Sequence, residues 1–215
     1  MSYCDWRNPR RPVNDHAAAL VIRSSRMAHI VHRHIALSRR PRRPGIDLAA
    51  AFDAVSPSVR DATLDASREL SRLGIRHALV GGVAVGAHGY PRATKIVEFL
   101  VGEEAFEHHG AIVTLRAPFQ VRGVAVDSVP VPAEGPFLAE ELEHHAESAG
   151  IPVVSIGALV FMKLLAGRRR DRADVVELVK AGVDVGAVRD YLARHAPERV
   201  AELDELVRDA ESEAD

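Results

Sequence analysis

The chain has 215 residues with a formal net charge of −2, and 47% of them are hydrophobic and 27% charged, which is typical of a soluble globular protein. A single cysteine, Cys4, excludes an intramolecular disulfide and favours a reducing, cytoplasmic location. The longest apolar runs are far shorter than the roughly 20 residues of a membrane-spanning helix, so no membrane segment is predicted.

The first 45 residues differ from the rest in charge. They hold ten arginines and two acids, a formal charge of +8, whereas the remaining residues carry −10. Basic runs punctuated by prolines, at 7–12 and 39–44, predict a flexible, extended arm. We interpret residues 1–45 either as a solvated tail or as a segment that binds a protein partner or the phosphates of nucleic acid. Aromatic residues make up only 5% of the chain, which argues against a base-stacking platform.

Residues 46–150 are predicted to form the α/β core. Ser56 followed by Pro57 is a helix-start signal, and Gly74 lies where that helix should end. Apolar runs bounded by turn residues then predict a small set of strands and short helices. The expected elements are a helix over 47–73 interrupted near Pro57, strands over 77–80, 95–101, 111–115 and 123–129, and helices over 83–88, 103–109 and 138–148.

Residues 151–215 are predicted to be a helical region packed on that core. After a short extended piece at 152–154, amphipathic patterns predict helices over 156–166, 171–181, 185–194 and 198–212. The order of elements predicts an α+β protein with an α/β-like core. It favours a small mixed sheet with flanking helices and a helical C-terminal extension over a long parallel wound sheet.

A glycine pair marks the first candidate site. In Leu79-Val80-Gly81-Gly82-Val83-Ala84 a buried strand ends and a helix begins at once. Glycine lets the backbone approach a neighbouring group closely, and a helix start presents free N–H groups. The same pattern also fits a tight turn with nothing bound.

Two acids interrupt apolar strands further along the chain. Strand parity over 94–101 places Val97 and Phe99 on the core face and Glu98 on the opposite face. Asp127 ends the apolar run that begins at Val124. The alternatives are an acid on a partly solvated strand face and a turn residue at a strand end.

Together, these segments resemble the nucleotidyltransferase superfamily, in particular the minimal and the abortive-infection toxin-type nucleotidyltransferases. The segments that carry the resemblance are Leu79–Ala84, His88–Lys95, Val160–Gly167 and Arg170–Asp174. They lie within 74–181, about half of the chain. In that family a diglycine turn precedes a strand with two alternating acids, and a later strand supplies a third acid.

The resemblance implies a small nucleotidyltransferase-type sheet and a role for eight residues. The implied metal ligands for Mg²⁺ are Glu98 and Asp127, with Lys163 as the group that neutralises triphosphate charge. The implied phosphate side of the site comprises Gly81, Gly82, Arg92, Thr94 and Lys95. The resemblance also implies a nucleoside triphosphate as substrate. Catalysis of nucleotidyl transfer depends mainly on positioning and on electrostatic stabilisation, which is the role of the charged residues named above.

The sequence departs from the family at one position. Ile96 stands where the first acid is expected, and isoleucine has no atom that can bind a metal ion. Loss of one preorganised electrostatic group typically lowers the rate by roughly 10²–10³. Two functions therefore stay open. The first is a divergent nucleotidyltransferase acting on an unknown hydroxyl. The second is an impaired relative that senses nucleotide or binds a partner, in a toxin–antitoxin or defence system.

Charged residues near Lys163 have two interpretations each. Arg168, Arg169, Arg170 and Arg172 are expected to be solvated residues at a helix end, where cations suit the C-terminus, with phosphate contact as the alternative. Asp171 fits a helix N-cap, and Asp171 and Asp174 also fit partners of Lys163 or of these arginines.

Overall fold

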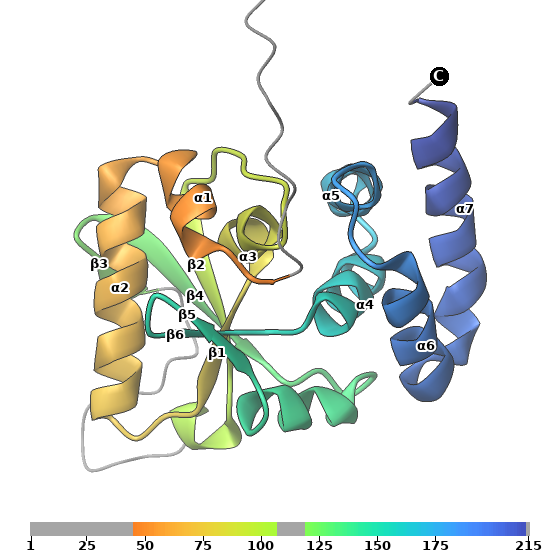
Figure 1. The fold of residues 1–215 in the computed structure, drawn as a ribbon. Coiled ribbons are helices and arrows are strands. Elements are labelled where there is room, and N and C mark those ends of the chain that lie inside the picture. The colour runs from red at the N-terminus through yellow and green to blue at the C-terminus, as the bar shows by residue number, and fades with distance from the viewer. Residues whose placement is uncertain (1–44, 107–118, 214–215) are drawn as a thin grey trace, which may run out of the picture. The chain divides into compact units, whose positions relative to one another are not determined.

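The computed structural model describes residues 45–106 and 119–213. They form an α+β fold in which one mixed sheet of six strands has helices on both faces (Figure 1). The expected fold class, a small mixed sheet with a helical C-terminal extension, is confirmed. Residues 1–44 of the expected arm and the expected strand over 111–115 lie outside the described residues.

The bounds of the elements follow the chain. The strands are β1 (His77–Val80), β2 (Ile96–Val101), β3 (Phe119–Val121), β4 (Val124–Pro130), β5 (Ala146–Ser148) and β6 (Ile151–Val153). The α-helices are α1 (Leu48–Asp53), α2 (Pro57–Arg72), α3 (Gly81–Ala87), α4 (Ile156–Ala166), α5 (Arg169–Lys180), α6 (Val185–His195) and α7 (Val200–Ser212). The 3₁₀ turns are η1 (Glu103–Phe106), η2 (Pro136–Leu142) and η3 (Pro197–Arg199).

The strand order is β3-β4-β2-β1-β6-β5. β2 and β4 run parallel, as do β1 and β6, and the other neighbours are antiparallel. In the β2–β4 ladder Glu98 stands directly opposite Asp127. The central position of β1 and β2 places the diglycine turn after β1 beside this ladder.

One face of the sheet packs on α2, and the helical C-terminal region lies on the other side (Figure 1). On the α2 side, Ser67 Oγ lies 2.8 Å from His77 Nε2, and the His77 ring packs edge-on against Phe99 with 5.4 Å between centroids. His77 Nδ1 donates to the Ile75 carbonyl, so Nε2 accepts from the serine, and burial lowers the pKa of His77. Because side chains alternate along a strand, Glu98 faces the opposite side, toward α3 and α4.

The helix ends follow the residues that signalled them. Ser56 Oγ accepts from the Val59 N–H at 3.3 Å, and Ser155 caps α4 in the same way. Gly167 ends α4 at φ +62°, a left-handed conformation that suits glycine. These caps separate α4 from α5 by a sharp turn, which brings the start of α5 back toward the sheet.

Two hairpins differ from the sequence-based expectation. The expected helix over 138–148 is a 3₁₀ turn over 136–142, and Ala146–Ser148 is strand β5. The strand Phe119–Val121 was not expected at all. Each hairpin has a two-residue turn in which both residues have positive φ, Ala149-Gly150 and Arg122-Gly123. Such turns match the twist of paired strands, but alanine and arginine are weak signals for them.

The sheet continues past the expected domain boundary at residue 150. That position lies in the β5–β6 turn, and β6 pairs with β1, so residues after 150 supply part of the sheet. In the parts of the chain that the structure describes, no helix has the length and apolar character needed to cross a membrane.

An ion pair ties the start of β1 to η1 and leads to a testable pH dependence. Arg76 donates to Glu104 through Nε at 2.9 Å and Nη2 at 2.8 Å, and it also pairs with Glu143. Hydrogen bonds from Arg76 lower the pKa of Glu104 from 4.5 to about 2. A lowered pKa stabilises the fold above the ordinary value, and this stabilisation is lost as the pH falls through the folded value.

We therefore expect the free energy of unfolding to fall between pH 4.5 and pH 2, measured by urea denaturation. Glu104→Gln should flatten the profile in that window. The exposed neighbour Glu103 has no side-chain partner among the described residues, so Glu103→Gln is the control and should keep the wild-type profile. Identical profiles for wild type and Glu104→Gln would contradict the assignment.

Candidate functional site

The structure brings the two predicted acids together beside the glycine pair. Glu98 and Asp127 are register partners on parallel strands, and their side chains leave the same face of the sheet. The Gly82 N–H donates to Glu98 Oε2 at 3.4 Å. A Cβ at Gly81 would lie 1.8 Å from Glu98 Oε2, and Gly81 has φ +66°. Glycine is therefore required at 81 both for backbone conformation and for space next to the Glu98 carboxylate.

A cavity of about 250 Å³ opens between this part of the sheet and α4. Glu98 and Gly81 contribute to its floor, and α4 contributes the opposite wall. Its lining comprises Val80, Gly81, Glu98, Val129, Pro132, Leu159, Met162, Lys163, Leu165, Ala166, Arg168 and Asp171. Asp127 is not part of this lining. Apart from Glu98, the charged lining residues Lys163, Arg168 and Asp171 lie together at one end, and the rest of the lining is apolar or glycine, a combination that suits an organic molecule with a polar group.

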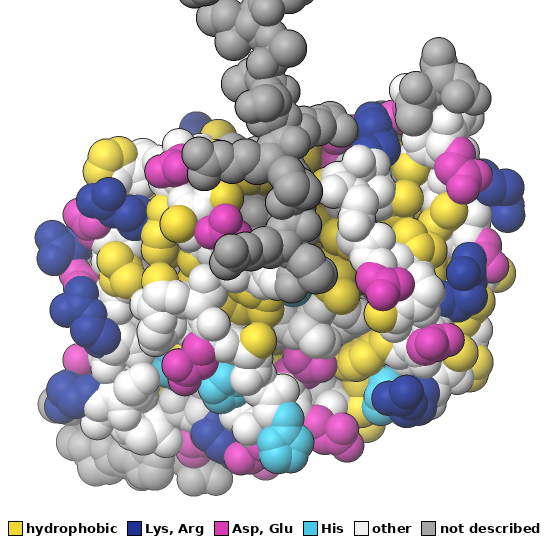
Figure 2. Space-filling view, viewed as in Figure 1, with side chains coloured by type: hydrophobic (Ala, Val, Ile, Leu, Met, Phe, Trp, Pro, Cys, Tyr) yellow, Lys and Arg dark blue, Asp and Glu magenta, His cyan; other side chains and the backbone are white. Residues whose placement is uncertain are grey.

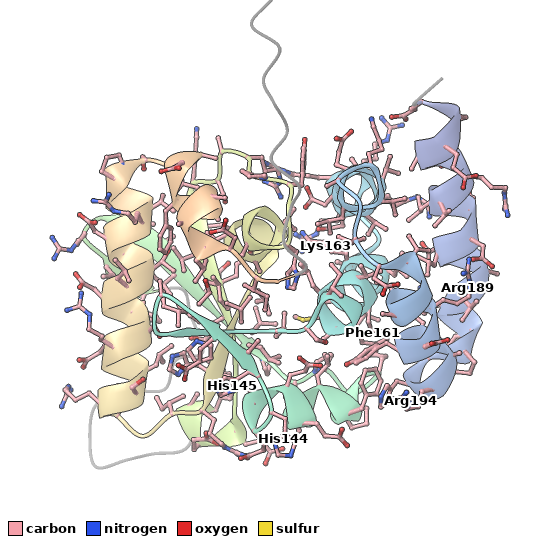
Figure 3. All side chains as sticks on the ribbon, in the orientation of Figure 1. His144, His145, Phe161, Lys163, Arg189 and Arg194 are labelled. Atoms are coloured by element: carbon pink, nitrogen blue, oxygen red, sulfur yellow. The ribbon has the colours of Figure 1, made fainter. Side chains whose placement is uncertain are left out.

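Lys163 lies at the charged end, on the side of α4 that faces α5 (Figure 3). Its ammonium group donates to Asp171 Oδ1 at 2.7 Å and pairs with Asp174 Oδ2 at 2.9 Å. Only 9% of Lys163 is exposed. Of the alternatives for the two aspartates, pairing with Lys163 is therefore confirmed.

Arg92 completes the cluster from the segment that follows α3. Its Nε and Nη2 each lie 2.7 Å from an oxygen of Asp174, a bidentate ion pair. We call Arg92, Lys163, Asp171 and Asp174 the buried tetrad. Two cations and two carboxylates give the buried tetrad a formal charge of zero. Arg92 and Lys163 therefore already have anionic partners within the protein.

The protonation behaviour of Asp174 follows from its surroundings. Burial acts to raise the pKa of Asp174, but hydrogen bonds from Arg92 and Lys163 outweigh it and leave the pKa below its ordinary value of 3.8. The carboxylate is thus ionised across the neutral range. Asp171 also has an oxygen, Oδ2, that is buried and accepts no hydrogen bond, with Arg168 Nε at 4.0 Å.

Thr94 and Lys95 occupy different positions from Arg92. Thr94 Oγ1 donates to the Ile96 carbonyl at 3.2 Å, and a Cβ at Gly82 would lie 3.1 Å from it. Thr94 therefore packs on the glycine turn. Lys95 is exposed and has no partner among the described residues.

Ile96 begins β2 on the face that carries Glu98. It is 37% exposed and stands opposite Ala125, so neither strand offers an oxygen ligand at this level of the ladder. Within residues 45–106 and 119–213, no three histidines, cysteines or acids converge as metal ligands do. The donor set is two carboxylates, which fits one magnesium ion completed by water and phosphate oxygens, but not a pair of ions.

The arginine run after α4 is solvated at a helix end as expected, since Arg168, Arg169 and Arg170 are exposed, but it lies between two helices. Arg168 is the N-cap residue of α5, and Arg169 and Arg170 are its first two residues. They therefore lie at the N-terminus of α5, where positive charge is unfavourable, and Arg168 also directly follows Gly167, the C-cap of α4. Asp171 lies in the first turn of α5, so its interpretation as an N-cap is wrong.

The apolar wall of the cavity was not predicted from the sequence. Leu159, Met162 and Ala166 are three and four residues apart along α4, a spacing that places them on one side of the helix. Val129 follows Asp127 by two residues and so shares its strand face. Each signal becomes useful only once the positions of Lys163 and Asp127 in the site are known.

The chain is similar to a solved structure in fold but matches no family model. No protein-family model matches the chain, and no curated protein sequence matches it. A search of solved structures finds similarity to the crystal structure of an antigenic nucleotidyltransferase-like protein from Paracoccidioides brasiliensis. The sequence identity is 13%, the match covers 72% of this chain and 94% of that chain, and the TM-score is 0.44. The function proposed below therefore rests on the geometry of the site.

Proposed function

We propose that the protein is a divergent nucleotidyltransferase that moves a nucleoside monophosphate from a nucleoside triphosphate to a hydroxyl group. One observation carries the proposal. Glu98 and Asp127 lie opposite each other on parallel strands, and Glu98 touches the glycine turn at the floor of the cavity. The sequence resemblance implies this arrangement, although the two acids are 29 positions apart in the chain.

The chemistry is a substitution at phosphorus. The acceptor oxygen bonds to the α-phosphorus while the bond from that phosphorus to the β-phosphate oxygen breaks. Pyrophosphate leaves, and the proton of the acceptor hydroxyl passes to water. The apolar lining of the cavity would hold the nucleoside, and Lys163 retains one N–H beyond the two that face its aspartates. That N–H is suited to bind a phosphate oxygen.

Glu98 and Asp127 would hold one Mg²⁺ through their carboxylates. When bound, the ion would neutralise phosphate charge, as hard divalent cations do at triphosphates. The β2–β4 register sets how far apart the two acids are, and the hydrogen bond from the Gly82 N–H orients the Glu98 carboxylate. The backbone of Gly81 sets the distance from this carboxylate to the start of α3.

The test measures binding of a non-hydrolysable nucleoside triphosphate in the presence of magnesium. The readouts are the melting temperature of the protein and the heat measured by titration calorimetry. We expect wild type to bind only when both components are present. Glu98→Gln preserves shape but removes a charge, and it should reduce this magnesium-dependent affinity at least tenfold. Glu211→Gln removes the same charge from an exposed site on α7 and should bind as wild type does.

Two results would contradict the proposal. One is a wild-type protein whose melting temperature and heat of mixing do not respond to magnesium with any of the four common nucleoside triphosphates. The other is a magnesium-dependent response that Glu98→Gln and Glu211→Gln retain equally.

A second candidate is an impaired relative that binds nucleotide, or a protein partner, without transferring anything, within a toxin–antitoxin or defence system. Ile96 favours it, because the site lacks one of the expected acids, and so does the internal pairing of Lys163. Incubation with α-labelled nucleoside triphosphates separates the two candidates. Release of pyrophosphate supports transfer, whereas binding with no release supports the second candidate.

A further inference from the structure

Four basic residues lie on two segments that meet near the cavity, and the proposed chemistry does not use them. Arg168, Arg169 and Arg170 begin α5, and Lys95 precedes β2. Arg170 Nη2 donates to the carbonyl of Ala93 at 3.4 Å, which joins the two segments. We call Lys95, Arg168, Arg169 and Arg170 the basic rim. Arg168 is the only member that also lines the cavity, so the others lie outside it.

The basic rim lacks close acidic partners. Arg168 has an 81% exposed side chain and only a 4.0 Å approach to Asp171, whose Oδ1 is already bound to Lys163. Arg170 contacts a carbonyl, and Arg169 and Lys95 have no partner among the described residues. The acids nearest in the chain, Asp171 and Asp174, belong to the buried tetrad. The positive charge of the basic rim is therefore not neutralised locally.

Most other arginines on the described surface are paired. Along α2 basic and acidic side chains alternate at the surface, as Figure 2 shows at the left edge of the view. The ion pairs include Arg68 with Asp65, Arg72 with Glu69, Arg122 with Asp65, Arg172 with Glu202 and Arg189 with Asp204. The basic rim thus stands apart as a local concentration of available charge, beside the candidate site.

Part of this charge also stands where the dipole of α5 opposes it. Cations in the first turn of a helix oppose the helix dipole. In the basic rim the N-cap and the first two residues of α5 are all arginines, and the N-cap makes no side-chain hydrogen bond. Binding of an anion by these side chains would remove the unfavourable interaction, since the bound charge has the opposite sign.

We propose that the basic rim binds the phosphate backbone of a nucleic-acid strand, and that a hydroxyl of this strand is the acceptor. The inference rests on the proposed function and names its acceptor class. Three of the four cations lie outside the cavity, so a triphosphate held inside does not account for them, whereas a strand that leaves the cavity passes over them. Neither the basic rim nor the cavity lining contains an aromatic residue, so the contact is with phosphates and not with stacked bases.

The test compares two double variants of the full chain that lose the same charge. Arg169→Ala with Arg170→Ala removes half of the basic rim. Arg194→Ala with Arg208→Ala removes two exposed arginines without side-chain partners in the described residues. Arg194 lies in α6 on a different side of the helical region from Lys163 (Figure 3). Any binding by residues 1–45 is common to both variants and cancels in the comparison.

The probe is a fluorescein-labelled 20-nucleotide strand, prepared as RNA and as DNA of the same sequence. Its affinity for the protein is measured by fluorescence anisotropy between 50 and 300 mM NaCl. For single strands the slope of log affinity against log salt is about 0.7 per phosphate contact, so the rim variant should have a slope shallower by about 1.4. Its affinity at 100 mM NaCl should fall about tenfold. The control variant should match wild type. Preference between the RNA and the DNA probe identifies the kind of strand.

Three outcomes would overturn the proposal: a wild-type protein that binds neither strand, equal losses in the two variants, or a rim variant that loses affinity for magnesium and triphosphate but not for the strands. The last outcome would assign the basic rim to the nucleotide. If wild type binds strands through the basic rim but fails to bind any nucleoside triphosphate, the proposed function fails and strand binding by the rim is supported.

Discussion

Asp174→Asn should lower the free energy of unfolding by about 3 kcal/mol at pH 7, the largest effect on stability that we expect from one substitution. Asp174 is 2% exposed and holds both Arg92 and Lys163. The amide retains the size of the carboxylate but removes its charge, so two largely buried cations share the single remaining carboxylate of Asp171. Urea denaturation measures the loss.

The pH dependence of this effect provides a second readout. Because the pKa of Asp174 is lowered in the fold, its contribution is present above the ordinary value of 3.8 and is lost as the pH falls through the folded value. The difference between wild type and Asp174→Asn should therefore shrink below pH 3.8. Asp190→Asn is the control, since Asp190 is exposed on α6 with no side-chain partner in the described residues. A loss below 1 kcal/mol, or equal losses in the two variants, would contradict the role of Asp174.

Ile96→Asp should have the largest effect on activity, an increase in transfer rate of roughly 10² or more. Ile96 lies on the same strand face as Glu98, two residues away, so an aspartate there adds a third carboxylate beside the glycine turn. The measurements are pyrophosphate release and magnesium-dependent binding of a non-hydrolysable triphosphate. Both should rise in the variant.

A matched control exists for this gain of function. Leu73 is 40% exposed, close to the 37% of Ile96, and it lies at the end of α2 on the other side of the sheet. Leu73→Asp adds the same charge at a similarly exposed position and should leave nucleotide binding and pyrophosphate release unchanged. If Ile96→Asp equals wild type while the protein remains folded, position 96 is not that of a metal ligand.

The buried tetrad connects stability with the site. Asp174 ties the segment after α3, through Arg92, to α4, through Lys163. The same segment continues through Thr94, which packs on Gly82, into β2. Substitutions in the buried tetrad are therefore expected to change the position of the glycine turn as well as the stability of the fold. A direct contact of Lys163 with nucleotide is best tested in a variant that keeps both aspartates, such as Lys163→Arg.

Local signals in the sequence were sufficient for much of this protein. Ser56, Pro57 and Gly74 set the ends of α2, and the alternation along β2 set the face of Glu98, because caps and strand parity depend on neighbouring residues alone. The resemblance added the expectation that Glu98 and Asp127 share one site, and the β2–β4 register places the two residues opposite each other.

Only the tertiary structure decided the contacts between distant segments. The strands β3 and β5 arise from hairpin turns whose residues, Arg122 and Ala149, give little sign of positive φ, so pairing with a neighbouring strand determines them. Likewise, Lys163 meets its partners Asp171 and Asp174 only because the turn at Gly167 folds α5 back on α4. Arg92 pairs with Asp174 although the two are 82 residues apart in the chain. Charge pairing of this kind depends on distances in space, which spacing along the chain does not specify.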